Sequence, residues 1–134
     1  MTDLSKLKPE KDTVEVLIKH PITDEDLLND DGTQMTITVY LPHSKEFKEA
    51  SYEVQNRRLK AVQKNRGKVD LDAEKLDREA LELEAKTIAA WDITYGGKKP
   101  KLSLEAAKEV LSDLPWLRDQ IAEAVANAQV FTKV

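Results

Sequence analysis

Two stretches near the start of the chain alternate between apolar and polar residues. In residues 13–20 (TVEVLIKH) and 33–41 (TQMTITVYL), apolar side chains recur at every second position. A period of two is typical of half-buried β-strands, which Thr, Val, Ile and Tyr also favour. Between them, residues 21–32 are acidic and end in the turn signal Asp31-Gly32. The pattern predicts two antiparallel strands joined by a long acidic loop.

The period changes to that of helices in the rest of the chain. Three of the predicted helices follow a capping residue, and the fourth begins with proline, which suits a first helical turn. These start signals are Ser44, Asp72, Ser103 and Pro115. The apolar spacing places the helices at about residues 45–65, 73–91, 104–112 and 115–131.

We therefore predict an α+β fold, with an N-terminal two-stranded β-hairpin followed by about four α-helices. Residues 1–12 are expected to form a flexible leader and residues 13–134 a single domain. A lone hairpin is marginal in water, so this one should pack on the helices or pair with another chain. Unpaired strand edges invite such pairing, and self-association is expected.

Composition restricts the chemistry. The chain has 134 residues and no cysteine, which excludes disulfides, thiolate catalysis and cysteine-ligated metals. Its net charge of −4 argues against general nucleic-acid binding. The start of the chain has no secretory signal, and apolar runs are far shorter than the roughly 18 residues that span a bilayer. We expect a soluble protein that stays where it is made and does not bind a membrane.

Catalytic and metal-binding patterns are weak. Only His20 and His43 could serve as histidine ligands, and both are expected at strand ends on the surface. The acidic loop fails the EF-hand pattern, since Gly32 at the sixth position would put Leu27 at the first. We interpret the loop as solvated and expect no enzyme activity, no metal and no cofactor. The acidic side chains of the loop are Asp24, Glu25, Asp26, Asp30 and Asp31.

A basic stretch follows in residues 57–68, which hold six cations and no acid: Arg57, Arg58, Lys60, Lys64, Arg66 and Lys68. These side chains could contact phosphates, or they could complement the dipole at the end of a helix. Because no aromatic residue is interleaved for base stacking, we favour the second interpretation and predict only weak, non-specific DNA binding. The later turn at Gly96-Gly97 lacks the spacing of a phosphate loop.

Aromatic residues are the candidates for protein recognition. Trp91, Trp116 and Phe131 either pack between helices or anchor a partner, since Trp is enriched at binding hot spots. On the last helix, Leu117 should face the core while Trp116 lies at its flank near Gln120. The candidate partner-binding residues are Trp91, Trp116, Gln120 and Phe131.

Three segments resemble the tail assembly chaperones of long-tailed bacteriophages. LPHSKEFKEA (41–50) is similar to a strand exit and Ser-capped helix of that family. AAWDITYGGKKPKLSLEAAKEVL (89–111) resembles its Trp, glycine turn and Ser-initiated helix, and LPWLRDQIAEAVANAQVF (114–131) its C-terminal Pro-Trp-Leu helix. Each segment is a packing pattern and none is a catalytic signature.

The resemblance implies a function in phage assembly. Proteins of this family bind the tape measure protein and the tail tube subunit in the host cytoplasm and are absent from the mature virion. Two other functions stay open: a nucleic-acid-binding accessory protein that uses residues 57–68, and a structural tail or head-completion protein retained in the particle. The resemblance favours the chaperone and, like the strand edges, points to a homo-oligomer.

Overall fold

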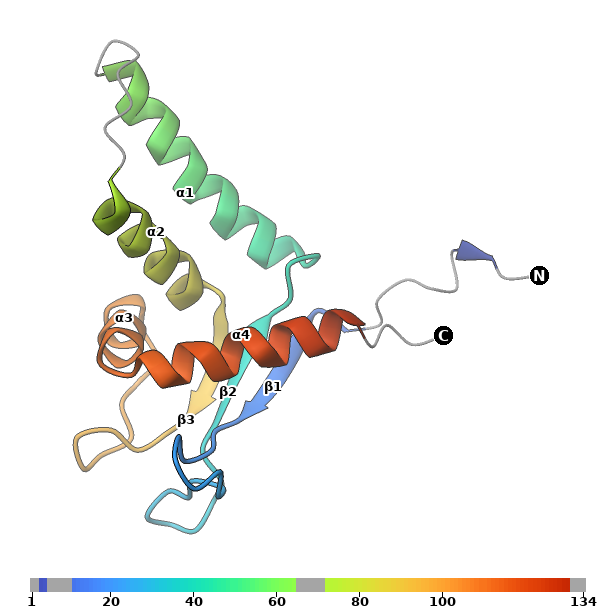
Figure 1. Ribbon diagram of the computed structural model, residues 1–134, viewed down its shortest axis with the longest axis vertical. Helices are drawn as coiled ribbons and strands as arrows, with labels where there is room; N and C mark the ends of the chain where they lie inside the picture. Colours follow the sequence, from blue (N-terminus) through green and yellow to red (C-terminus); the bar gives the residue numbers. More distant parts are fainter. Residues whose placement is uncertain (1–2, 5–10, 65–71, 131–134) are drawn as a thin grey trace.

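A computed structural model describes residues 3–4, 11–64 and 72–130, with the side chains of the last helix described as far as Ala128. The elements in chain order are β1 (Thr13–Leu17), β2 (Thr36–Tyr40), α1 (Lys45–Lys64), α2 (Ala73–Lys86), β3 (Ile88–Asp92), α3 (Leu104–Asp113) and α4 (Pro115–Val130). The predicted α+β class is confirmed. The helices lie on one side of the sheet, and α1 and α2 rise away from it as a helical hairpin (Figure 1).

The predicted two-stranded sheet is wrong, because the described residues form three strands in the order β1-β2-β3. Residues 88–91 were expected to end the second helix, with Trp91 on its apolar stripe. Instead α2 stops at Lys86, where the Thr87 hydroxyl donates to the Glu84 carbonyl at 2.8 Å. Strand β3 then pairs antiparallel with β2, with Trp91 opposite Ile37. The edge of β2 that the sequence left open is thus filled from within the chain.

The sheet has one covered and one open face. Val16, Ile37 and Val39 point toward the helices and are buried, because alternate residues of a strand face opposite sides. The register places Glu15 beside Thr38 and Thr38 beside Ala90 on the other face. This division explains the alternating pattern of the sequence.

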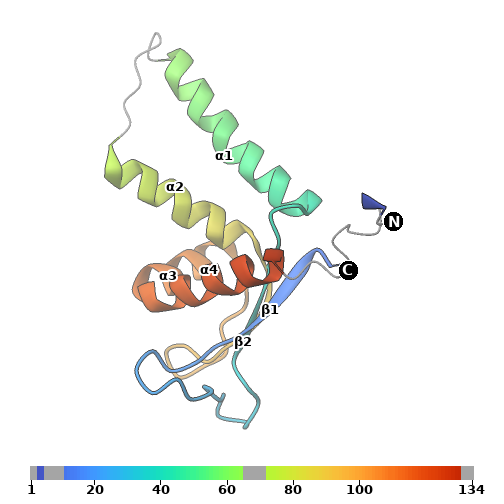
Figure 2. The ribbon, with the colours of Figure 1, turned by 45° about the vertical axis from the view of Figure 1, so that its right-hand side comes forward.

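One buried cluster joins the sheet to the helices. Ala107, Val110 and Leu111 of α3 and Leu117 and Ile121 of α4 pack against the core face of the strands. The Ser103 hydroxyl accepts from the Ala106 N–H at 3.1 Å, so α3 is capped as predicted. Helix α4 lies over β1 (Figures 1 and 2).

The hairpin of α1 and α2 has little apolar packing. Helix α1 buries only Ala50 and Val54 among its 20 residues. Ser44 caps its start by accepting from the Phe47 N–H at 3.1 Å. Much of the contact between α1 and α2 is made by ion pairs, which are described below. The end of α1 therefore extends from the body, as both views show (Figure 2).

Of the predicted leader, Lys11 and Asp12 are attached to the body. The Asp12 carbonyl accepts from the Leu41 N–H at 2.7 Å, and His43 Nε2 lies 2.9 Å from the Lys11 carbonyl. Residues 1–2 and 5–10 lie outside the described residues.

Candidate protein-binding groove

An apolar groove of about 270 Å³ opens where α1, α2 and α4 meet the end of β2. Phe47 comes from the first turn of α1 and Leu83 from the last turns of α2. Helix α4 supplies one wall with four apolar residues: Ile121, Ala122, Val125 and Ala126. Val39 and Tyr40 line the groove from β2, and Pro42 lines it from the turn that follows β2. Glu84 and Thr87 complete the lining at the end of α2.

Backbone hydrogen bonds fix the junction beneath the groove. The Tyr40 N–H donates to the Thr87 carbonyl at 2.8 Å, which ties the end of β2 to the end of α2. The Ser44 N–H donates to the Leu41 carbonyl at 2.9 Å, which turns the chain from β2 into α1. Because Ser44 and Thr87 are both buried, the walls of the groove are held by satisfied polar groups.

The single carboxylate of the lining is already paired. Arg118 Nη2 lies 2.6 Å from Glu84 Oε2, and its Nε donates to the same oxygen at 2.9 Å. This pairing with Glu84 raises the pKa of Arg118 above its ordinary value. The groove therefore offers apolar contact area to a ligand and has little polar chemistry of its own.

The predicted candidates for partner binding do not line this groove. Trp91 is half-buried on β3, and its indole Nε1 donates to the Pro100 carbonyl at 3.0 Å. Trp116 is half-buried and packs against the core cluster from α4. Phe131 lies outside the described residues.

Gln120 has a partner within the chain. Its amide nitrogen donates to the Lys19 carbonyl at 2.7 Å, and its amide oxygen accepts from the Lys19 N–H at 3.0 Å. The Gln120 amide thus hydrogen-bonds both the N–H and the carbonyl of Lys19, as the backbone of a neighbouring strand would. This contact fixes α4 at the edge of the sheet and assigns Gln120 a structural role.

Two members of the basic stretch are bound to α2. Arg57 Nη1 lies 2.8 Å from Glu82 Oε2, and Arg58 Nε donates to Glu79 Oε2 at 2.9 Å. The hydrogen bond from Arg57 lowers the pKa of the Glu82 carboxyl. Lys60 and Lys64 are exposed on α1, whereas Arg66 and Lys68 lie outside the described residues. The predicted basic patch is thus divided, and two of its six cations neutralise an acidic helix.

The histidines lie in turns. His20 Nδ1 accepts from the Ile22 and Thr23 N–H groups at 3.1 and 3.2 Å. His43 Nε2 lies 3.3 Å from Asp12 Oδ1. No group of three or more metal-ligating side chains that could hold an ion occurs in the part of the chain that the structure describes.

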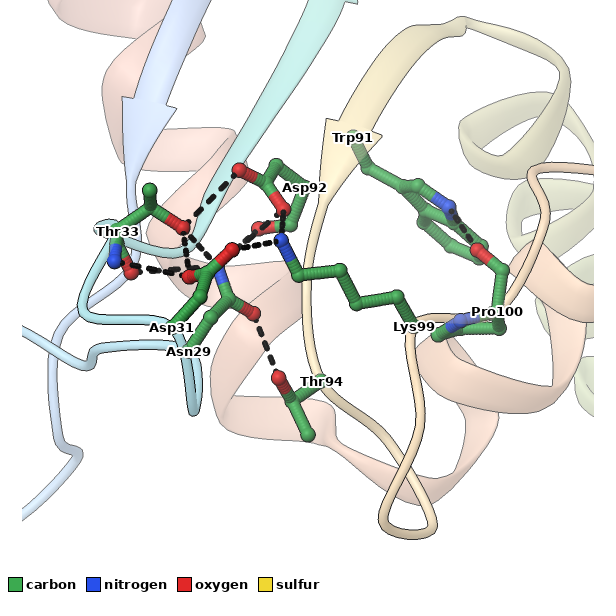
Figure 3. A network of polar contacts seen from close by, with 8 residues as sticks. All are labelled: Asn29, Asp31, Thr33, Trp91, Asp92, Thr94, Lys99 and Pro100. Carbon is green, nitrogen blue, oxygen red and sulfur yellow. Dashed lines mark hydrogen bonds and ion pairs between the residues drawn. The ribbon is translucent and has the colours of Figure 1, made fainter.

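The acidic loop contains a polar network that the sequence did not reveal (Figure 3). Asn29 is buried, with 4% of its surface exposed. Its amide nitrogen approaches the Thr33 hydroxyl at 3.2 Å and Asp92 Oδ1 at 3.3 Å, and its oxygen accepts from the Thr94 hydroxyl at 2.6 Å. Asn29 therefore joins the loop after β1 to the residues that follow β3.

Asp31 and Lys99 close this network at the surface. Lys99 Nζ lies 2.8 Å from Asp31 Oδ2 and 3.1 Å from Asp92 Oδ1. The turn at Gly96 and Gly97, both at positive φ, brings Lys99 back toward the sheet. Hydrogen bonds from Lys99 and then from Thr33 hold the pKa of Asp31 far below its ordinary value of 3.8.

This network predicts an acid-sensitive contribution to stability. Because the pKa of Asp31 is lower in the folded chain, the unfolded chain takes up the proton first as the pH falls. The contribution is complete above pH 3.8 and is lost progressively below it. Urea titrations between about pH 6 and 2 should show a shallower loss of stability for Asp31→Asn than for the wild type. The exposed neighbour Asp30, outside this network, provides the control Asp30→Asn, and a wild-type slope for Asp31→Asn would contradict the assignment.

No protein-family model, no curated protein and no solved structure matches this chain. No helix in the described residues is long and apolar enough to cross a membrane.

The groove residues had a visible signal in the sequence. Phe47, Leu83 and Val125 each belong to an apolar stripe of a predicted helix. What the stripes could not show is that their ends converge at one place. That convergence depends on the crossing of α4 over the sheet and on the short α2.

Proposed function

We propose that this protein is a non-catalytic tail assembly chaperone that holds an apolar helical segment of the tape measure protein in the groove and also binds the tail tube subunit. The resemblance of residues 41–50, 89–111 and 114–131 to that chaperone family supports the class of protein. The observation that supports the mode of action is the apolar groove at the base of α1.

The size and chemistry of the groove favour a protein ligand. Small-molecule sites usually measure about 300–1,000 Å³ and carry a few polar groups that orient the ligand. This groove is smaller, and its one carboxylate is paired with Arg118. An amphipathic helix needs only a few apolar anchors in such a groove, so the groove suits one face of a helix.

The two other functions have less support. Nucleic-acid binding would use the cations of residues 57–68, and two of these are already paired. Arg57 is bound to Glu82, and Arg58 is bound to Glu79. A structural protein would remain in the particle, whereas a chaperone would leave. Mass spectrometry of purified particles separates these two fates.

A substitution in the groove tests the proposal directly. Ala122 lines the groove but is exposed, so Ala122→Arg adds a bulky cation there without disturbing the core. We expect this variant to capture the co-expressed tape measure protein about tenfold less than the wild type, as loss of a hot spot would.

The matched control is Ala80→Arg, which makes the same change at an exposed position of α2 outside the groove. It should capture the tape measure protein as the wild type does. Equal capture by both variants would remove the groove as the binding site. Failure of the wild type to capture either tail protein would overturn the proposed function itself.

A further inference from the structure

Strand β1 lies at one side of the sheet and has a backbone edge that faces away from β2. The Leu41 N–H donates to the Asp12 carbonyl at 2.7 Å. The Ile18 N–H donates to the Met35 carbonyl at 3.1 Å, so the even-numbered residues bond toward β2. The backbone groups of the odd-numbered residues therefore point outward, in the plane of the sheet. In the strand these residues are Thr13, Glu15 and Leu17.

The chain covers only the far end of this edge. Gln120 bonds the outward N–H and carbonyl of Lys19 at 3.0 and 2.7 Å, in the position of a neighbouring strand. No hydrogen bond reaches the outward backbone groups of Thr13, Glu15 or Leu17 from the part of the chain that the structure describes. Three alternate residues are thus available to a further strand.

The opposite edge of the sheet, formed by β3, is better protected. The pairing of β3 with β2 is irregular between Thr38 and Val39, and a bulge hinders the addition of another strand. The segment that returns from the glycine turn also lies beside β3, where the Pro100 carbonyl accepts from the Trp91 indole (Figure 3). The free part of β1 is therefore the place where the sheet can be extended.

The charge of Glu15 determines which strand can add there. Its side chain is exposed beside Thr38 on the open face, and its carboxylate is bound to no residue that the structure describes. A second copy of β1 could pair all three free residues only with Glu15 opposite Glu15, and like charges directly opposite destabilise a strand pair. Shifted registers pair at most two of the three with one another. A different strand, with a cation opposite Glu15, can use all three.

We infer that the free edge of β1 binds an extended segment of a partner protein, which adds antiparallel as a fourth strand with a Lys or Arg opposite Glu15. Main-chain hydrogen bonds to the three free residues hold the segment, and its side chains give selectivity. Leu17 is 46% exposed on the same face, so an apolar residue fits opposite it. The edge shares no residue with the groove, and the inference does not depend on the proposed function.

The first experiment titrates the isotope-labelled full chain with the capped peptide Thr-Val-Val-Lys-Val-Thr-Thr. Bound antiparallel, its lysine lies opposite Glu15 and its first valine opposite Leu17. We expect saturable NMR shifts and slower amide exchange at Thr13, Glu15 and Leu17. The same peptide with Glu in place of the lysine should bind about fivefold more weakly, because a favourable cross-strand pair becomes a repulsive one.

Charge reversal on the protein provides the matched comparison. Glu15→Lys should bind the Glu peptide more tightly than the Lys peptide, since the cross-strand pairing is exchanged. Glu109 is exposed on α3, so Glu109→Lys makes the same change in net charge away from the sheet edge. This control should keep the preference of the wild type for the Lys peptide. Loss of the preference in both variants would show a general charge effect and overturn the inference.

The second experiment tests whether binding uses the backbone, with changes made only to the peptide. The N–H of its lysine points at β1, whereas the N–H of the next valine points away. N-methylation of the lysine should therefore abolish binding, and N-methylation of that valine should leave it intact. Binding that survives methylation of the lysine would contradict strand addition.

The remaining outcomes also overturn the inference. The absence of saturable shifts with the Lys peptide would show that the edge does not take up a strand. Shifts centred on the groove would place the peptide there instead. A dimer in sedimentation equilibrium, with exchange at Thr13 and Glu15 that slows as the concentration rises, would assign the edge to a second copy. A failed titration leaves the groove untouched, because Ala122→Arg tests the groove separately.

Discussion

Leu117→Ala is expected to lower the free energy of unfolding by about 2–5 kcal/mol, the cost of emptying a well-packed leucine site. Leu117 is 1% exposed and lies where α4 meets the sheet and α3. Its removal takes buried apolar surface from the core and leaves a cavity that the surrounding strands cannot fill. Urea denaturation followed by circular dichroism measures the loss.

The control for this prediction is Leu104→Ala, which deletes the same atoms at a position that is 39% exposed. It should change the free energy of unfolding by no more than about 0.5 kcal/mol. Trp116→Ala should cost less than Leu117→Ala, because Trp116 is half-buried at the flank of α4. If Leu104→Ala and Leu117→Ala destabilise equally, the assignment of Leu117 to the core is wrong.

Helix starts were the most predictable part of the fold because they depend on local chemistry. Ser44, Asp72 and Ser103 each accept from a backbone N–H three residues later, as their positions predicted. Pro115 begins α4, where a missing N–H costs nothing. Such signals are contained within one turn of the chain, and a sequence therefore displays them.

The third strand could not be predicted because its residues fit two periods. Leu83, Thr87 and Trp91 are spaced four apart and continue the apolar stripe of α2. The same segment becomes a strand because β2 has an unpaired edge that only a distant part of the chain can fill. Tertiary pairing overrides the local preference here. The earlier end of α2 also determines where the groove lies.

The side-chain contacts of the acidic loop were also only partly predictable from the sequence. Its five carboxylates were predicted to be solvated, and all five are exposed. Asn29, an uncharged member of the loop, instead reaches Asp92 and Thr94, more than 60 residues further along the chain. No local pattern distinguishes a buried asparagine from a loop asparagine, since its partners come from another element.

Asn29→Leu is the second substitution with a large expected effect, and it tests this buried network. Leucine is close to asparagine in shape but cannot donate or accept, so the Thr94 hydroxyl loses the acceptor that lies at 2.6 Å. The carbonyl and carboxylate of Asp92 lose a donor as well. Leaving such groups unsatisfied should cost about 1–3 kcal/mol of unfolding free energy.

The loss should be local before it is global, because Asn29 joins the loop after β1 to the residues that follow β3. Hydrogen exchange of Asn29→Leu should therefore speed up first at Thr33 and Met35, whose N–H groups are bonded within this loop region. Asn127→Leu, at an exposed position of α4, is the matched control and should leave both stability and exchange unchanged. Unaltered exchange in Asn29→Leu would show that the network does not hold the two loops together.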